Sequence, residues 1–229
     1  MKLLLTSYGI TNSSIANALT ELIGKQPSES KIAFIPSGDN TKRGDKSWMV
    51  GHINKFIEAG YYVDLIELTA LEPDAIKSAF EDVDAIVVGG GNCFYLSYWM
   101  QKKGIFDFLP QILESKVYVG ISAGSMLAAK NFNLSSQALA REENISAYDY
   151  NNLGPAGESS GRTLSLVDFV FKPHLNSAES ANLRTEDYVK SVAYRANGQI
   201  YAVDDQSAVK VIDGIAEVVS EGNWLHLNA

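Results

Sequence analysis

Apolar runs of strand length alternate with segments of helical periodicity over the first two thirds of the chain. Strands with their following turns are predicted at residues 3–9, 31–38, 61–68, 85–91 and 117–121. Helices are predicted between them, at residues 11–24, 46–60, 72–83, 93–104 and 106–115. Strands that are apolar on both faces belong in the middle of a parallel sheet covered by helices. The pattern therefore predicts a doubly wound, mostly parallel α/β sheet.

The end of the chain has a different pattern. Residues 200–227 contain three or four short strands, separated by turn signals at Asp213-Gly214 and Glu221-Gly222-Asn223. We expect them to form an antiparallel extension on one edge of the sheet. Residues 140–163 are polar and rich in glycine and serine, which predicts a long loop, and long loops in compact domains are often functional.

Composition narrows the class of protein. The 229 residues are 46% hydrophobic, and we expect one α/β domain over residues 1–229. A net charge of −8 argues against a nucleic-acid partner, and no run approaches the roughly 18 apolar residues of a membrane span. Cys93 is the single cysteine, so no intramolecular disulfide forms and a cytoplasmic location is expected. The three widely spaced histidines form no metal-ligand pattern with it, and we expect no metal.

A serine between two glycines follows the last of the predicted parallel strands. The sequence Gly-Ile-Ser-Ala-Gly places Ser122 between Gly120 and Gly124, directly before a segment that looks helical. A strand that ends on this motif and turns at once into a helix holds its serine on a strained bend near the positive end of the helix. An ordinary turn of small residues explains the same letters, so the motif alone leaves both interpretations open.

A serine nucleophile needs a base within hydrogen-bond reach, and histidine is the usual one. His174 follows an apolar predicted strand, at a proline where a loop leaves the sheet. His52 lies inside a predicted amphipathic helix, and His226 lies near the end of the chain. Because sites in open α/β sheets assemble at the carboxyl ends of strands, His174 is the favoured base. The alternative is a loop histidine that binds a backbone carbonyl.

The base in turn needs a group to orient it, usually a carboxylate. Asp204 and Asp205 end another short apolar strand. Neighbouring residues of an extended chain point opposite ways, so at most one of the two faces His174, and the other faces solvent or caps the turn. Asp168 lies in the predicted strand 166–171 and serves only if that strand bends. The pair ranks first, and the residues alone do not choose between its members.

Gly89, Gly90 and Gly91 end a buried strand and let the backbone approach a ligand with its amides free. Beside Ser122, one of these amides and the amide of Ala123 would bind the oxyanion of a tetrahedral intermediate. A tight strand-to-helix turn or a phosphate cradle are the alternatives.

Four segments together resemble the peptidase E family of aspartyl dipeptidases, which includes the cyanophycinases and has a fold akin to class I glutamine amidotransferases. These segments are VVGGGNCFYL (87–96), VGISAGSM (119–126), KPHLN (172–176) and YAVDDQSAV (201–209). The resemblance implies a flavodoxin-like or class I glutamine amidotransferase-like sheet and a serine peptidase that needs neither metal nor cofactor. It implies Ser122 as nucleophile, His174 as general base and Asp205 as the acid of the triad, with Gly90 and Gly91 as oxyanion donors.

The family archetype cleaves dipeptides that begin with aspartate, so the implied partner is a small peptide, bound by a monomer or homodimer. The resemblance places Asn92 at a helix start near the substrate. A substrate carboxylate in so acidic a chain needs a dedicated cation, best a guanidinium. Arg184 is the candidate, with Lys42 and Arg43 behind it. An exposed helical Arg184 paired with a nearby acid is the alternative.

Three other functions fit parts of the sequence. The Ser/Thr/Asn-rich turn after the first strand lies where flavodoxin-like proteins hold a flavin phosphate, although capping residues explain it as well. Cys93 opens a helix after the glycine run, where a catalytic thiolate would be stabilised, although a buried apolar cysteine is the commoner case. A binding protein with a decayed catalytic site is the last alternative.

Overall fold

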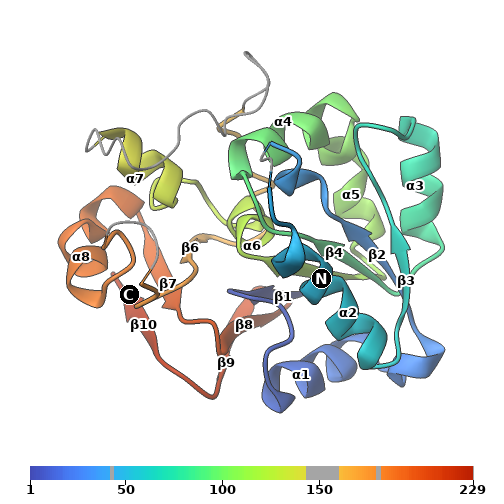
Figure 1. The fold of residues 1–229 in the computed structure, drawn as a ribbon, viewed down its shortest axis with the longest axis horizontal. Helices are drawn as coiled ribbons and strands as arrows, with labels where there is room; N and C mark the ends of the chain where they lie inside the picture. The colour runs from blue at the N-terminus through green and yellow to red at the C-terminus, as the bar shows by residue number, and fades with distance from the viewer. Residues whose placement is uncertain (42–43, 143–159, 179–181, 229) are drawn as a thin grey trace.

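The computed structural model describes residues 1–41, 44–142, 160–178 and 182–228. Its larger sheet consists of Lys2–Thr6 (β1), Lys31–Ile35 (β2), Tyr62–Leu65 (β3), Ala85–Val88 (β4), Val117–Ile121 (β5), Ser207–Ile212 (β8) and Ile215–Ser220 (β9). The order of these seven strands is β3-β2-β4-β5-β1-β8-β9 (Figure 1). Strands β1 to β5 are parallel, and β8 and β9 continue the sheet antiparallel beside β1. The predicted α/β class and its antiparallel extension are confirmed.

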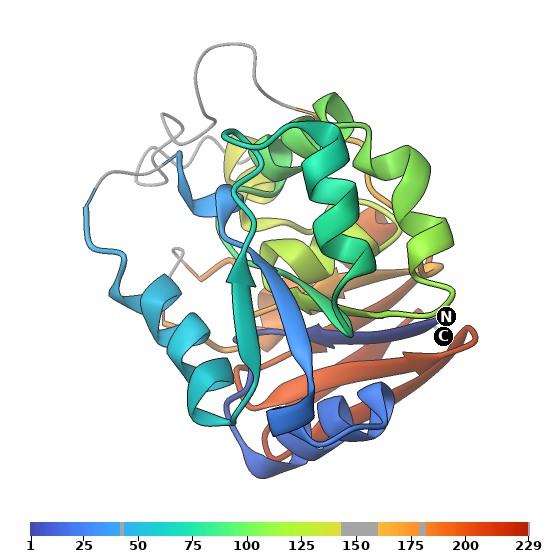
Figure 2. The same ribbon diagram turned by 90° about the vertical axis from the view of Figure 1, so that its right-hand side faces the viewer.

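Helices cover both faces of this sheet, as Figure 2 shows. The helices of this part are Ser13–Ile23 (α1), Ser47–Glu58 (α2), Pro73–Glu81 (α3), Cys93–Lys102 (α4), Ile105–Ile112 (α5) and Ala123–Ala128 (α6). Helices α1 and α2 pack on one face and α3 to α6 on the other. Asn12 accepts a hydrogen bond from the Ile15 amide at the start of α1, and Gly24 ends that helix in the left-handed conformation. Within the described residues no helix is both long and apolar enough to cross a membrane.

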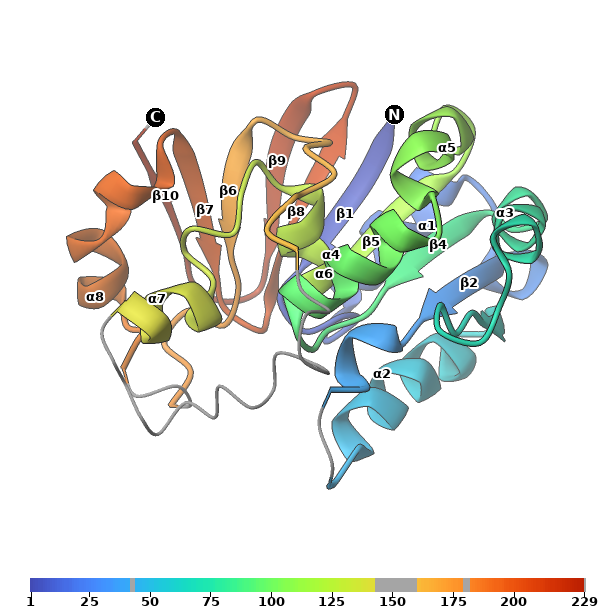
Figure 3. The same ribbon diagram turned by 90° about the horizontal axis from the view of Figure 1, so that it is seen from above.

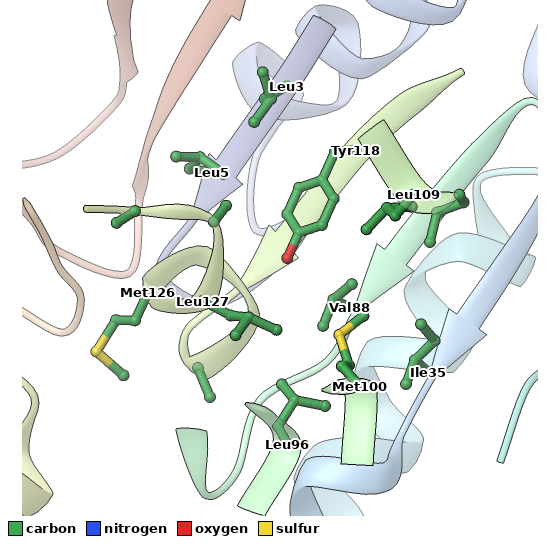
Figure 4. Packing of buried hydrophobic residues seen from close by; sticks show 14 of the residues in the cluster. Leu3, Leu5, Ile35, Val88, Leu96, Met100, Leu109, Tyr118, Met126 and Leu127 are labelled. Carbon is green, nitrogen blue, oxygen red and sulfur yellow. The ribbon is translucent and has the colours of Figure 1, made fainter. Parts of the chain in front are cut away.

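The strands are apolar on both faces because both faces are covered. Along β1, Leu3 and Leu5 face the α3–α6 layer and Leu4 faces the α1–α2 layer. Figure 4 shows Tyr118 of β5 among the apolar side chains of the α3–α6 layer. Its hydroxyl donates a hydrogen bond of 2.7 Å to the carbonyl of Gly124, so the core also fixes the beginning of α6.

A second sheet lies beside the first and contains Phe169–Lys172 (β6), Gln199–Val203 (β7) and Trp224–Leu227 (β10) in the order β10-β7-β6. Strands β6 and β7 are parallel, and β10 is antiparallel to β7. Helices Ser136–Glu142 (α7) and Glu186–Ser191 (α8) pack on this sheet through a core of their own (Figure 3). Two expectations therefore change: β7 and β10 leave the edge extension for a separate sheet, and residues 140–142 are helical. Most of the predicted loop, residues 143–159, lies outside the described residues.

The register of the strands brings distant segments to one edge. Thr6 at the end of β1 pairs with Ile121 at the end of β5, and Val88 at the end of β4 pairs with Gly120. The chain leaves β7 at Val203 and, after three intervening residues, re-enters the larger sheet in β8, next to β1. The carboxyl ends of β1, β4, β5, β6 and β7 therefore meet, which is the position where sites form in such sheets.

Candidate active site

Ser122 occupies a strained bend between β5 and α6. Its backbone angles are φ 49° and ψ −103°, outside the regions that a serine adopts without cost. Both flanking glycines are required by close backbone packing. A Cβ at Gly120 would lie 2.5 Å from the backbone of Ser125, and a Cβ at Gly124 would collide with the carbonyl of Val88. The motif is therefore an elbow that aims the serine hydroxyl away from the sheet.

Ser122, His174 and Asp205 form one hydrogen-bonded chain. The Ser122 hydroxyl lies 2.8 Å from Nε2 of His174, and Nδ1 of the same ring lies 2.6 Å from Oδ1 of Asp205. Asp204 faces the other way and accepts hydrogen bonds from Ser207 and Asn223, which caps the turn. Of the two adjacent acids, Asp205 is thus the one that contacts the imidazole.

Ser7, the residue directly after β1, also forms hydrogen bonds with His174 and Asp205. Its hydroxyl donates to Oδ1 of Asp205 at 2.6 Å and accepts a hydrogen bond from the backbone amide of His174 at 2.8 Å. Both groups are held by one fully buried side chain. Ser7 therefore fixes the acid and the imidazole relative to the main sheet, a contact that the sequence interpretation did not foresee.

The surroundings set the charge state of the pair. Burial lowers the pKa of His174 below its usual 6.5 despite the opposing effect of Asp205, and the cations Arg184 and Lys172 lower it further. Burial also disfavours the charged form of Asp205. The hydrogen bonds from His174 and Ser7 outweigh this effect and hold the pKa of Asp205 below its usual value. Near neutral pH the ring is neutral and the acid ionised, the state in which Nε2 accepts a proton.

Three backbone amides belong to residues near the serine: Ala123 follows it in the chain, and Gly90 and Gly91 line the same cavity. Gly90 lies beside Ser122, since a Cβ at Gly90 would be 3.7 Å from the serine Cβ. Gly91 has a φ of 113°, and a Cβ there would collide with Gly38. In the described part of the chain, the amides of Gly90, Gly91 and Ala123 donate no hydrogen bond. They are available to a negative charge that develops next to the Ser122 hydroxyl.

A cavity of about 350 Å³ opens in front of the serine. Tyr8, Trp48 and His52 line it from the side of α2, together with Asp39. Ser136 and Gln137 of α7, Lys172 of β6 and Arg184 line it from the side of the second sheet. Figure 3 shows α2 and α7 on opposite sides of α6. The cavity therefore lies between the two sheets, with one largely aromatic wall and one polar wall.

The two predicted substrate-binding residues, Arg184 and Asn92, differ in their surroundings. Arg184 lines the cavity, and its Nη1 donates to the Ser177 hydroxyl at 3.3 Å. Asn92 is buried, and its side-chain oxygen accepts hydrogen bonds from the amides of Phe94 and Tyr95. Asn92 starts α4 as predicted and caps that helix, and its place beside the substrate stays a prediction. Residues 42 and 43, the two further candidate cations, lie outside the described residues.

The other candidate acid and base lie elsewhere. Asp168 precedes β6, is largely exposed, and pairs with Lys130 at 2.8 Å. His226 stacks on Tyr201 in the second sheet, with ring centroids 4.3 Å apart. His52, which lies in the predicted helix 46–60, is buried in the cavity wall with its ring edge-on to Tyr8 and Trp48. Burial lowers the pKa of His52 to about 4, so this ring is neutral at physiological pH.

The structure opposes the cysteine and flavin alternatives. Cys93 is fully buried, which raises the pKa of its thiol to about 12 and excludes a thiolate at neutral pH. At the start of α1, where a flavin phosphate would bind, the carboxylate of Glu221 accepts hydrogen bonds from the hydroxyls of Ser13 and Ser14. It also accepts one from the Ser14 amide, so an anionic side chain already occupies that helix end.

The fold and the site define a class: α/β proteins whose elbow serine is hydrogen-bonded to a histidine–carboxylate pair. The sequence profile of the family described as Peptidase family S51 matches residues 3–219. The chain belongs to this family, is a peptidase by that membership, and its resemblance to the peptidase E family is confirmed.

Individual proteins support the same relationship. A peptidase E of Nostoc sp. is 29% identical over 168 residues, which cover 69% of this chain and 61% of that protein. An uncharacterized peptidase of Pasteurella multocida is 24% identical over 80% of this chain and 84% of its own length. A crystal structure from Listeria monocytogenes EGD-e, of a protein assigned provisionally to peptidase E, has the same fold. It matches with a TM-score of 0.75 at 20% identity, over 96% of this chain and 98% of that one.

Proposed function

We propose that this chain is a serine peptidase that hydrolyses short peptides by acyl transfer to Ser122. The observation that carries the proposal is the continuous hydrogen-bond chain from the Ser122 hydroxyl through His174 to Asp205. A serine hydroxyl becomes nucleophilic only when a base takes its proton, and Nε2 of His174 is in place to do so. The strained elbow and the adjacent amides support the same role.

The reaction proceeds in two halves. The Ser122 oxygen attacks the carbonyl carbon of the scissile bond while its proton passes to Nε2 of His174. The carbon–nitrogen bond then breaks, and the imidazolium returns that proton to the leaving amine. Water attacks the acyl-enzyme with the same ring as base, and the carboxylic acid product leaves with Ser122 restored. Asp205 stays ionised throughout and stabilises the imidazolium.

Charge on the substrate oxygen is stabilised by backbone amides. In this proposal the amides of Gly90 or Gly91 and of Ala123 donate to the oxyanion of each tetrahedral intermediate. Removing one such donor typically costs about 3–4 kcal/mol of transition-state stabilisation. Because the donors are backbone groups, the position of the glycine run after β4 determines their geometry.

We infer a dipeptidase that prefers an N-terminal aspartate. The cavity of about 350 Å³ lies at the small end of ligand pockets, roughly 300–1,000 Å³, which suits a short peptide. Arg184 in its wall supplies a guanidinium for a substrate carboxylate. A panel of dipeptides that differ in the first residue tests this preference. Equal cleavage of Asp-Leu, Glu-Leu and Ala-Leu would contradict it.

The test of the peptidase activity compares Ser122→Ala with Ser125→Ala. Ser125 lies in α6, the helix that follows Ser122, but its hydroxyl donates to the carbonyl of Thr6 and makes no hydrogen bond to His174. Ser122→Ala is expected to lower kcat by several orders of magnitude, and Ser125→Ala is expected to retain it. A fluorophosphonate should add its mass to the parent and not to Ser122→Ala. Hydrolysis by Ser122→Ala within about tenfold of the parent would refute the proposal. A parent that neither cleaves dipeptides nor reacts with the probe would also refute it, because that is the behaviour of a decayed catalytic site.

A further inference from the structure

Lys172 is a buried lysine whose ammonium has no ionic partner among the described residues. Its side chain in β6 is 1% exposed, yet it lines the cavity in front of Ser122. Among the residues that the structure describes, no carboxylate pairs with its ammonium. The contact that the ammonium makes is with the Ser136 hydroxyl at 3.5 Å, beyond the length of a good hydrogen bond. A buried cation of this kind is rare in proteins unless it is paired.

The other fully buried charge in the cavity wall is balanced. Asp39 is 2% exposed, and the ammonium of Lys46 lies 2.6 Å from its Oδ2. For Lys172 the neighbouring charge is of the same sign, because Arg184 lines the same cavity and acts on Lys172 by charge repulsion. The wall therefore holds a buried ammonium that no carboxylate of the described residues balances.

Burial of its charge makes Lys172 destabilising for the folded chain. Loss of solvent, with the repulsion from Arg184, lowers its pKa from 10.5 to about 7. Perturbed lysines in cavities are candidates for functional groups, because packing alone would be served better by an apolar side chain. An anion bound in the cavity would remove the penalty, since it supplies the missing partner.

We propose that Lys172 binds a carboxylate of the substrate, as a second cation beside Arg184. The inference rests on the proposed function, since it concerns the substrate of the same site. What it adds is a second residue that recognises the carboxylate of the substrate. That carboxylate is either an acidic side chain or the free C-terminus of the peptide, and the same ammonium recognises both.

Binding to an inactive variant tests the inference without turnover. Calorimetry would compare Ser122→Ala with the double variants that also carry Lys172→Met or Lys130→Met. Lys130 is the matched control, because it is partly exposed, pairs with Asp168 and lies outside the cavity lining. The ligands are Asp-Leu, Asn-Leu and Asp-Leu-amide. The two analogues each replace one carboxylate by a neutral amide.

Lys172→Met is expected to weaken binding of Asp-Leu about 10- to 100-fold, the effect of losing one charged hydrogen bond, while Lys130→Met leaves it unchanged. The difference between Lys172→Met and its parent should disappear with Asn-Leu or with Asp-Leu-amide. The ligand with which it disappears shows whether Lys172 binds the side-chain carboxylate or the C-terminal one. An equal loss for all three ligands, no loss at all, or no measurable binding of Asp-Leu would each overturn the inference. A protein that cleaves peptides but ignores Lys172→Met refutes this inference alone. One that binds through Lys172 but cleaves no peptide refutes the proposed function alone.

Discussion

Replacing Lys172 with methionine is expected to stabilise the fold at neutral pH. The pKa of the lysine falls from 10.5 to about 7 on folding, because its charge is buried. At about 1.4 kcal/mol per pKa unit, this shift costs up to about 5 kcal/mol where the unfolded lysine is charged. Methionine fills a similar volume without a charge, so the variant avoids the cost.

The stability that Lys172→Met gains over the parent depends on pH in a defined direction. Between pH 7 and 10.5 the unfolded chain binds a proton at Lys172 that the folded chain has mostly released, so the parent becomes more stable as pH rises. The advantage of the variant is therefore largest at pH 7 and below. It should shrink by about 2 kcal/mol between pH 7 and pH 9, a change of about 4–8 °C in the difference of melting temperatures for a chain of this size.

Urea unfolding of both proteins at pH 7, 8 and 9 measures this difference directly. The difference in unfolding free energy between variant and parent cancels the contribution of the other groups that titrate. The control Lys130→Met removes a partly exposed ion pair, so its unfolding free energy should differ from that of the parent by at most about 1 kcal/mol at each pH. A Lys172→Met advantage that stays constant from pH 7 to 9 would refute the reasoning. A variant less stable than the parent at pH 7 would refute it as well, since both results mean that the folded lysine keeps its proton.

Two further predictions concern the hydrogen-bonded chain. Asp205→Asn is expected to lower kcat about 10⁴-fold, because an amide no longer holds the imidazole in the tautomer that accepts the serine proton. Asp204→Asn should retain kcat and lose about 1 kcal/mol of stability as a turn cap, and the reverse ranking in dipeptide assays would contradict the assignment. The value of kcat/KM for a neutral dipeptide should fall only below pH 6.5, because burial lowers the pKa of His174 and the ring must be neutral to act. A midpoint at or above pH 6.5 in the pH profile would show that the ring is not shielded as described.

The larger sheet could be predicted because its strands and helices are coded locally. Each parallel strand is a short apolar run, and capping residues such as Asn12 and Gly24 mark where α1 begins and ends. The second sheet could not be predicted in the same way. Its strands have the same apolar pattern as those of the main sheet, and the choice of pairing partner depends on contacts between β6 and β7, which lie about thirty residues apart.

The same distinction separates the expected from the unexpected residues of the site. Ser122, His174 and Asp205 each follow an apolar run, so their place at the ends of strands was readable. Ser7 also follows a strand, but its role depends on β1 lying between β5 and β8. His52 lies on the buried face of α2 as its periodicity indicates, and periodicity does not tell a cavity wall from the core.

The charges around the imidazole connect recognition with catalysis. Lys172 and Arg184 lower the pKa of His174, and Arg184 also helps to keep Asp205 ionised. A substrate carboxylate bound by these cations would offset their field, so the pKa of His174 would rise in the complex and the ring would become a stronger base. A peptide without that carboxylate leaves the field in place and meets a weaker base. Preference for an anionic substrate would then appear in kcat as well as in KM, because the groups that bind the anion also tune the group that takes the proton.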